Sequence, residues 1–271
     1  MTLSEELKAR LLEMGLEPKK AFGQNFLVSP HVIGKIVEAV RERSFAEIIE
    51  IGPGLGALTE PLLKLGLRPR LIELDRDLVN YWRQRGLEVI DQDALKVNWG
   101  DLALRAPTLL VSNLPYQIST HLVIDRCLGP RELQHMVLMF QKEVAQRLVA
   151  VPSTKEYGLL SVMAQLHFRM KKVVDAAPQD FFPAPKVASR VLAFERQELG
   201  CALGLPFLKF VKGAFAFRRK FLLKNLKGVV DKSKHGQLIE VLGALGHSEK
   251  VRAEELSPKE FALLFEKLYE H

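Results

Sequence analysis

The 271-residue chain is poor in the residues that cross-link small proteins or bind metals, with only two cysteines, Cys127 and Cys201. Their spacing matches no zinc or iron–sulfur site, and its seven histidines form no cluster along the sequence. Two distant thiols are typical of buried cysteines in a reducing compartment. The sequence therefore predicts neither a disulfide framework nor a metal site.

Long hydrophobic runs are also missing. No apolar stretch approaches the roughly 18 residues that a membrane span requires. The first residues, 1–16, carry charges at helical spacing and form an amphipathic helix pattern, which differs from a secretory signal peptide. We therefore expect a cytoplasmic protein that has no membrane partner.

Acidic residues are outnumbered: 39 Lys and Arg stand against 32 Asp and Glu, giving a net charge of +7 and a pI near 9.4. An excess of this size favours an acidic partner, with nucleic acid ahead of an anionic membrane surface. The composition, 48% hydrophobic and 26% charged, is that of an ordinary globular protein. Its length fits one large domain, or a domain with a smaller companion.

The first two thirds of the chain alternate between strand and helix patterns. Short apolar runs predict strands at 47–51, 70–74, 87–90, 108–111 and 135–140. Helical patterns separate these runs, and such alternation predicts an α/β fold with a parallel, doubly wound sheet. After about residue 196 only helical patterns remain, at 205–213, 218–227, 237–242 and 258–269. We therefore expect an α/β domain at 1–198 and a small all-helical domain at 199–271.

A glycine-rich loop, residues 50–57, follows the first of these strands. Gly52, Gly54 and Ala57 fit the G-x-G-x-x-A pattern of dinucleotide-binding proteins. The same loop fits S-adenosylmethionine enzymes, in which it surrounds the amino acid part of the cofactor. Both kinds of site place an acid after the second strand to bind ribose hydroxyls, and Glu73 is suitably placed for either. The loop alone leaves both interpretations open.

Three acids favour the second interpretation. Glu50, Glu73 and Asp93 follow successive strands, at the carboxyl edge where open α/β sheets bind ligands. A carboxylate at Glu50 would oppose a pyrophosphate but would attract the ammonium and sulfonium of S-adenosylmethionine. Asp93 would accept a hydrogen bond from the adenine amino group. The alternatives are a turn-forming aspartate at Asp93 and a solvated strand end at Glu50, and neither explains the series of acids.

The stretch Ser112-Asn113-Leu114-Pro115-Tyr116 follows the fourth strand and points to the same edge. Taken alone, asparagine and proline indicate a turn. An amine such as adenine N6 is a poor nucleophile because its lone pair is delocalised, so an enzyme that alkylates it needs two hydrogen-bond acceptors. The Asn113 side-chain oxygen and the Leu114 carbonyl would supply them. Pro115 would stiffen the loop and Tyr116 would stack on the base.

Several motifs in order resemble one family, the rRNA adenine N6,N6-dimethyltransferases. They are residues 20–27, Asn113–Tyr116, 140–145, 181–189 and 215–220. The closest branch acts on the small subunit and is associated with kasugamycin resistance. The resemblance implies a Rossmann-like class I methyltransferase fold and S-adenosylmethionine as cofactor. It also implies dimethylation of two adjacent adenines in the hairpin loop near the 3′ end of 16S rRNA, during small-subunit assembly.

The resemblance and the glycine-loop argument together predict the site residues. The catalytic set is Asn113, Leu114, Pro115, Tyr116 and Phe181, with Tyr116 and Phe181 on either side of a flipped base. Cofactor contacts are expected from Gln24, Asn25, Leu27, Glu50, Gly52, Gly54, Glu73, Leu74, Asp93, Ala94 and Asn113.

Between residues 209 and 234 nine lysines and arginines stand against one acid, Asp231. Such a run is usually a solvated face, but its one-sided charge predicts phosphate contacts and salt-dependent RNA binding. The expected RNA contacts are Lys186, Arg218, Arg219, Lys220, Lys224 and Lys227. Three positions depart from the family pattern: Ala188 replaces an acid, Phe217 a polar residue and Phe221 a hydroxyl residue. They concern RNA contacts rather than the methyl transfer.

Other functions fit parts of the same pattern. A non-catalytic RNA-binding or assembly factor would keep the fold and not depend on Glu73 or Asn113. The erythromycin-resistance branch would modify 23S rRNA, although the loop at 181–189 and the long C-terminal region favour the small-subunit branch. A nicotinamide oxidoreductase fits only the glycine loop. We expect a monomer whose partner is 16S rRNA or the assembling small subunit.

Overall fold

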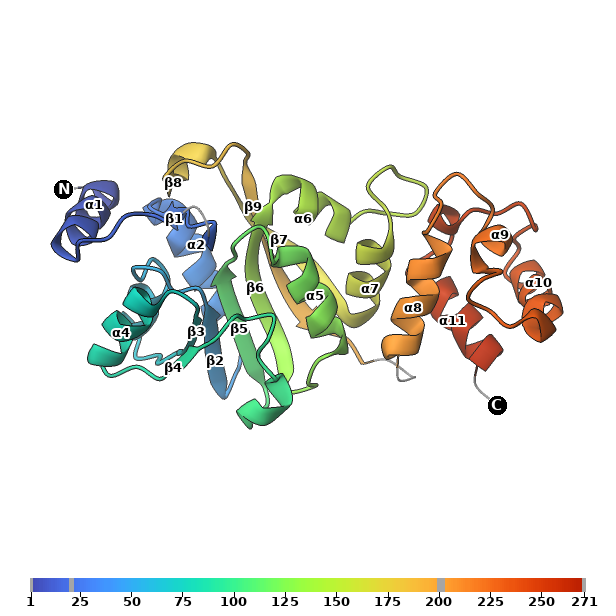
Figure 1. The fold of residues 1–271 in the computed structure, drawn as a ribbon, viewed down its shortest axis with the longest axis horizontal. Coiled ribbons are helices and arrows are strands. Elements are labelled where there is room, and N and C mark those ends of the chain that lie inside the picture. Colours follow the sequence, from blue (N-terminus) through green and yellow to red (C-terminus); the bar gives the residue numbers. More distant parts are fainter. Residues whose placement is uncertain (1, 20–21, 199–202, 270–271) are drawn as a thin grey trace. The chain divides into compact units, whose positions relative to one another are not determined.

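The computed structural model describes residues 2–19, 22–198 and 203–269, shown in Figure 1. It divides into two compact units: residues 1–145 with 170–196, and residues 146–169 with 197–271. The predicted division after residue 198 placed residues 146–169 in the α/β part, whereas their contacts group them with the C-terminal helices. The reason is α7, Leu159–His167, which is buried on almost every side and is part of the helical core.

Within the described residues the first unit is built on a seven-stranded sheet in the order β4-β3-β2-β5-β6-β9-β7. The strands that the sequence predicted are β2 (Glu47–Ile51), β3 (Arg70–Glu73), β4 (Val89–Asp91), β5 (Thr108–Asn113) and β6 (Leu133–Gln141). They pair in parallel. Two further strands complete the sheet, β7 (Phe168–Ala176) and β9 (Ser189–Arg196).

The sheet is therefore mixed rather than wholly parallel, because β9 pairs antiparallel with β6. The register places Glu50 of β2 opposite Leu71 and Val111, and Asn113 of β5 opposite Met139. Parallel pairing brings the ends of β2, β3, β4 and β5 to one edge of the sheet, as Figure 1 shows. The side chains at these strand ends converge there.

Helices cover both faces of the sheet. α2 (Pro30–Arg41) and α3 (Thr59–Lys64) form an apolar cluster with β2, β5 and β6 that includes Ile36 and Val111. α4 (Arg76–Gln84) packs the fully buried Trp82 against β3 and β4. Leu110, on the opposite face from Val111, is also fully buried, so that face is covered as well. Each such buried side chain contributes about 1.5–3 kcal/mol.

The first unit contains further helices and one short strand pair. They are α1 (Leu3–Glu13), α5 (Ser119–Leu128), α6 (Lys142–Leu148), which extends into the second unit, and the strand pair β1 (Phe26–Leu27) and β8 (Phe181–Phe182). Cys127 of α5 is a buried free thiol whose pKa burial raises to about 12. Cys201 lies outside the described residues.

The second unit is helical, as predicted for the C-terminal region. Besides α7 it contains α8 (Leu205–Ala214), α9 (Leu222–Leu226), α10 (His235–Ala244) and α11 (Pro258–Tyr269). α9 is shorter than the predicted 218–227, because residues 216–220 form turns. A capping box precedes α11: Ser257 N–H donates to Glu260 Oε2 (2.7 Å) and Glu260 N–H donates to Ser257 Oγ (3.3 Å).

Aromatic side chains form the core of this second unit. The rings of Phe207 and Phe265 meet edge to face at 5.3 Å, and Phe215 packs on Phe261 at 5.6 Å. In the part of the chain that the structure describes, short 3-10 turns include Trp99–Leu102, Pro178–Asp180, Lys232–Lys234 and Ala253–Glu255. Among the described residues no helix is long and apolar enough to cross a membrane, and no three acidic, cysteine or histidine side chains gather as metal ligands.

Candidate active site

A cavity of about 280 Å³ opens at the carboxyl edge of the sheet. It brings together all of the predicted cofactor-binding residues and four of the five predicted catalytic residues. These are Gln24, Asn25, Leu27, Glu50, Gly52, Gly54, Glu73, Leu74, Asp93, Ala94, Asn113, Leu114, Pro115 and Tyr116. Phe181 lies outside this lining. Residues that are up to 92 positions apart in the sequence therefore share one cavity.

The glycine loop reaches the cavity in a conformation that glycine favours. Gly52 and Gly54 have φ angles of +63° and +55°, which L side chains rarely adopt. A Cβ at Gly54 would lie 3.0 Å from the Phe26 ring. Trp82 Nε1 donates a hydrogen bond to the Gly54 carbonyl at 2.9 Å, which restrains the loop. The loop thus presents its backbone to the cavity with no side chain in between.

Glu50 is a buried carboxyl at the start of this loop, 1% exposed. Thr59 Oγ1 donates a hydrogen bond to Glu50 Oε2 at 2.7 Å. Burial raises the pKa of Glu50 to about 8, and the neighbouring charge of Glu73 adds to the effect. Among the described residues no cationic side chain pairs with it. Glu50 is therefore not a solvated strand end, and a cationic ligand beside it would favour the charged form of its carboxyl.

Glu73 is the last residue of β3 and Asp93 lies just after β4, and both complete the acidic lining. Glu73 Oε1 accepts the backbone N–H groups of Leu74 (2.8 Å) and Asp75 (2.9 Å), which holds the carboxyl in place. Burial is the main cause that raises the pKa of Glu73. Asp93 Oδ1 accepts the N–H of Leu95 at 3.0 Å, so Asp93 forms the turn considered above and also lines the cavity.

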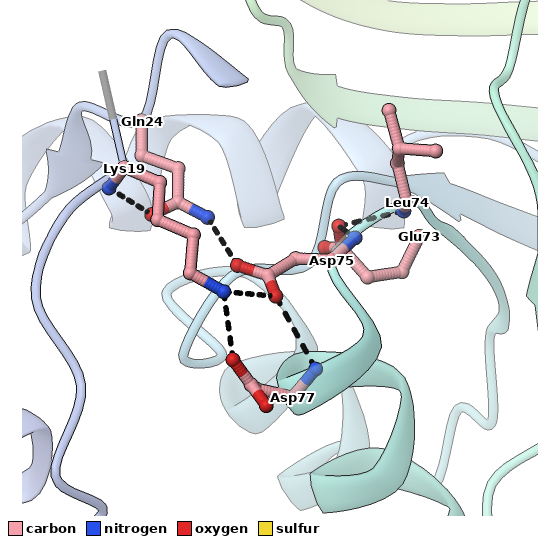
Figure 2. A network of polar contacts seen from close by, with 6 residues as sticks. All are labelled: Lys19, Gln24, Glu73, Leu74, Asp75 and Asp77. Atoms are coloured by element: carbon pink, nitrogen blue, oxygen red, sulfur yellow. Dashed lines mark hydrogen bonds and ion pairs between the residues drawn. The ribbon is translucent and has the colours of Figure 1, made fainter. Parts of the chain in front are cut away.

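A polar network that the sequence did not predict ties the N-terminal segment to the end of β3, and Figure 2 shows it. Lys19 Nζ lies 2.7 Å from both Asp75 Oδ1 and Asp77 Oδ2. Gln24 accepts the Lys19 N–H at 2.8 Å and donates to Asp75 Oδ2 at 3.0 Å. These bonds hold Gln24 at the cavity wall. Lys20 and Ala21, the start of the predicted cofactor motif, lie outside the described residues.

The Asn113–Tyr116 segment is a turn, and its hydrogen bonds select which groups stay available. Asn113 Nδ2 donates to the Asn25 carbonyl at 3.0 Å, so the amide is oriented with Oδ1 as the remaining acceptor. The Pro115 carbonyl accepts the Ile118 N–H at 3.2 Å. Within the described residues neither Asn113 Oδ1 nor the Leu114 carbonyl accepts a hydrogen bond. The two predicted acceptors are both uncommitted.

The predicted aromatic pair differs from expectation. Tyr116 is half-buried and lines the cavity. Phe181 is 4% exposed and packs in the apolar cluster with Leu27, its partner across the β1–β8 pair. The structure therefore does not bring Phe181 to Tyr116. The neighbouring Phe182 is the ring on the solvent side, because side chains alternate along a strand.

A second, outer cavity of about 860 Å³ adjoins the first and shares Gly23, Gln24, Asn25 and Tyr116 with it. Phe182, Pro183 and Pro185 give it a flat apolar wall, and Lys8 and Lys186 add positive charge. Lys8 Nζ lies 4.7 Å from the centre of the Phe182 ring. An apolar surface flanked by cations suits a base attached to a phosphate backbone. Lys186, a predicted RNA contact, therefore lines this outer cavity.

The other predicted RNA contacts lie in the second unit. Arg218 Nε donates to Glu254 Oε2 and Arg218 Nη2 to the Thr154 carbonyl, both at 2.7 Å, so its guanidinium cross-links two loops. Phe217 is 58% exposed rather than part of the core, with Lys220 Nζ 4.1 Å from its ring centre. Arg218 is therefore committed within the protein, although it is exposed like the other predicted contacts here, Arg219, Lys220, Lys224 and Lys227.

The donor set fits S-adenosylmethionine better than a dinucleotide. A pyrophosphate requires cationic or N–H donors near the loop, whereas Glu50 and Glu73 place two buried carboxyls there. A ligand with an ammonium, a sulfonium, ribose hydroxyls and an adenine amine would pair with these acids. The parallel strands, the glycine loop and the acidic lining define an S-adenosylmethionine-dependent methyltransferase of the class I fold.

Comparison with known proteins agrees with this class. The profile of the family "Ribosomal RNA adenine dimethylase" matches residues 15–269. A protein of Bdellovibrio bacteriovorus called ribosomal RNA small subunit methyltransferase A is 50% identical over 268 residues, covering 98% of each chain. A protein of the same name from Desulfitobacterium hafniense is 40% identical, covering 95% of this chain and 94% of its own.

Two solved structures share the fold of this chain. A dimethyladenosine transferase from Plasmodium falciparum superposes with a TM-score of 0.74 at 25% identity, covering 88% of this chain and 95% of its own. The 23S rRNA methyltransferase ErmE shares the fold, with a TM-score of 0.62 over 90% of this chain and 99% of its own. The chain belongs to the ribosomal RNA adenine dimethylase family. It is an S-adenosylmethionine-dependent enzyme that methylates rRNA adenine, and the predicted resemblance is confirmed.

Proposed function

We propose that the enzyme transfers two methyl groups to N6 of each of two adjacent adenines in the 3′-terminal hairpin loop of 16S rRNA. In this proposal its substrate is the assembling small subunit and it acts as a cytoplasmic monomer. The observation that carries the proposal is the pair of uncommitted acceptors, Asn113 Oδ1 and the Leu114 carbonyl, beside an acidic cavity. The names of the two relatives at 50% and 40% identity support the choice of the small subunit.

S-adenosylmethionine, when bound, supplies an electrophilic methyl group on a positively charged sulfur. Glu73 would hold its ribose hydroxyls, Asp93 its adenine amine and Glu50 its ammonium. These three side chains line the cavity from successive strand ends. Their role is to bind and orient, because the rate of such a transfer depends on alignment of donor and acceptor atoms.

The chain's own contribution to the chemistry comes from the Asn113–Tyr116 turn. Asn113 Oδ1 and the Leu114 carbonyl would accept the two N–H bonds of adenine N6 and draw this nitrogen towards a pyramidal geometry. Its lone pair then becomes available for attack. The Tyr116 ring would stack on the flipped base, a contact worth about 1–3 kcal/mol. After the first transfer the methylated N6 releases one proton to solvent, so one N–H remains, and one acceptor suffices to hold it for the second transfer.

The test uses small ribosomal subunits from cells that lack this methylation. Wild-type enzyme with labelled cofactor should produce N6,N6-dimethyladenosine, found by mass spectrometry at two adjacent positions of 16S rRNA. Asn113→Ala should lower the rate at least about a hundredfold, as loss of a preorganised polar group does in other enzymes. Asn80→Ala, an exposed asparagine on α4, serves as the matched control and should keep full activity.

The outcomes separate the candidate functions. Methylation of 23S rRNA but not 16S rRNA would contradict the small-subunit assignment. Full activity of Asn113→Ala would contradict the proposed role of the turn. Equal rates on free 16S rRNA and on subunits would argue against the assembling particle as substrate. Light scattering checks the oligomeric state, where a monomer has a mass of 30.6 kDa.

A further inference from the structure

One partly buried hydrogen bond joins the Asn113–Tyr116 turn to a distant part of the sequence. The Tyr116 hydroxyl and Ser189 Oγ lie 2.6 Å apart, although 73 residues separate them. Ser189 is the last residue of the predicted motif at 181–189 and is 0% exposed. Among the described residues this is the one hydrogen bond that its side chain makes. The bond connects two predicted motifs by their side chains.

Ser189 sits on a rigid backbone. It begins β9 and pairs with Gln141 at the end of β6, and the Lys142 N–H donates to the Ala188 carbonyl at 2.9 Å. Both strands lie inside the sheet. The Ser189 hydroxyl therefore has a fixed position relative to β5, the strand that leads into the turn.

Tyr116 lies in a different setting. Its residue is in a turn, and its half-buried ring lines both the inner and the outer cavity. A tyrosine ring on a turn can rotate about two side-chain bonds, and a ring in the wrong orientation would present its edge to the base. A single hydrogen bond at the hydroxyl end removes most of this freedom.

We propose that Ser189 is a positioning residue that fixes the ring plane of Tyr116 for stacking on the target base. The inference rests on the proposed function, since it concerns the same base. Ser189 itself does not line either cavity and touches no substrate in this arrangement. A typical hydrogen bond of this kind corresponds to a change of about 3- to 10-fold in rate.

The experiment compares Ser189→Ala, Tyr116→Phe and the double variant on RNA. Both single variants remove the same bond and should lower kcat about 3- to 10-fold while the S-adenosylmethionine Kd stays unchanged. Because they act through one contact, the double variant should be no slower than the slower single variant. Fluorescence of 2-aminopurine at the target position should report weaker stacking in all three.

Ser161→Ala is the matched control. Ser161 is also fully buried, and its hydroxyl donates to the Arg147 carbonyl at 2.5 Å in the second unit. It should lose stability while kcat is retained. If Ser189 acts only in folding, Ser189→Ala should lose stability and retain kcat, as is expected of Ser161→Ala.

Three results would overturn the inference. They are wild-type kcat in Tyr116→Phe, wild-type kcat in Ser189→Ala, or losses that multiply in the double variant. If Ser189→Ala does not fold, Tyr116→Phe still decides, because it removes the bond and keeps the serine. An inactive wild-type enzyme would overturn the proposed function and this inference with it, whereas an active wild type with unaffected variants overturns the inference alone.

Discussion

Binding of S-adenosylmethionine should release a proton from Glu50, and Glu50→Gln should abolish that release. Glu50 is buried, holds one hydrogen bond from Thr59 and has a pKa of about 8. At about pH 7 roughly nine tenths of the protein therefore carries a neutral Glu50. A cationic ammonium beside the carboxyl favours the charged form, so binding must be accompanied by loss of the proton.

The size of the effect follows from the same pKa. Below about pH 8 the binding-competent carboxylate becomes about tenfold rarer for each unit of pH, so the Kd should rise about tenfold between about pH 7 and about pH 6. In Glu50→Gln this change in Kd should disappear. Glu73 also lines the cavity, and its pKa is raised as well. The difference in the pH dependence of the Kd between wild type and Glu50→Gln therefore measures the contribution of Glu50 alone.

Calorimetry at both pH values, in two buffers with different heats of ionisation, measures the Kd and the protons released. The matched control is Glu47→Gln, which alters another buried carboxyl of β2. Glu47 lies at the opposite end of that strand, 3.0 Å from Arg70 Nη1, and should keep the pH dependence of the wild type. Parallel pH profiles of wild type and Glu50→Gln would refute the reasoning.

Folding supplies an independent readout of the same pKa. A carboxyl whose pKa is raised on folding costs nothing well below its unfolded value of 4.5 and opposes folding increasingly as the pH rises towards about 8. Above that pH the cost is complete. Glu50→Gln should therefore raise the free energy of unfolding at about pH 9, by as much as about 5 kcal/mol, and leave it nearly unchanged at about pH 4.

Two further predictions concern the loop and the RNA contacts. Gly56→Ala should lower the free energy of unfolding in urea by about 3 kcal/mol, because φ is +94° and a Cβ would lie 2.9 Å from Trp82. Gly66→Ala, with φ +76° but no atom within 4 Å, should cost about 1–2 kcal/mol, and equal losses would contradict the packing argument. Lys227→Ala should lower the slope of log affinity for RNA against log salt by about 1 at unchanged stability. An unchanged slope in Lys227→Ala would argue against a phosphate contact there. Arg218→Ala should instead lower the melting temperature, because it breaks the hydrogen bonds to Glu254 and to the Thr154 carbonyl.

Much of the cavity could be predicted because its residues follow strands at the same edge of a sheet. Glu50, Glu73 and Asn113 each end a short apolar run, and parallel pairing alone brings such ends together. Local pattern was sufficient for these residues. The identity of each side chain then indicated its partner, since acids suit a cationic cofactor and amide oxygens suit an amine.

The Lys19 network could not be found in the same way. Lys19 and Asp75 are 56 residues apart, and nothing in either local sequence marks the pair. Their contact depends on how the N-terminal segment folds back over the end of β3, which is a tertiary property. The single lysine and the two acids it contacts look like ordinary surface charges until the fold is known.

The strands β7 and β9 were missed for a related reason. The sequence at 181–189 matches a loop motif, which gives no signal for the strand β9 that begins at its last residue, Ser189. Phe181 was expected beside Tyr116 because the motif places an aromatic there. The β1–β8 pair turns its side chain into the core and leaves Phe182 at the outer cavity instead.

The polar groups that form the Asn113–Tyr116 turn differ from those that are proposed to bind the target amine. The turn uses the Pro115 and Tyr116 carbonyls, which accept from Ile118 N–H and from a serine hydroxyl. It uses the nitrogen of Asn113 to hold the Asn25 carbonyl. The groups it does not use are Asn113 Oδ1 and the carbonyl of Leu114. A buried turn leaves few polar groups unpaired, so two uncommitted acceptors beside an acidic cavity are the pair that a planar amine requires.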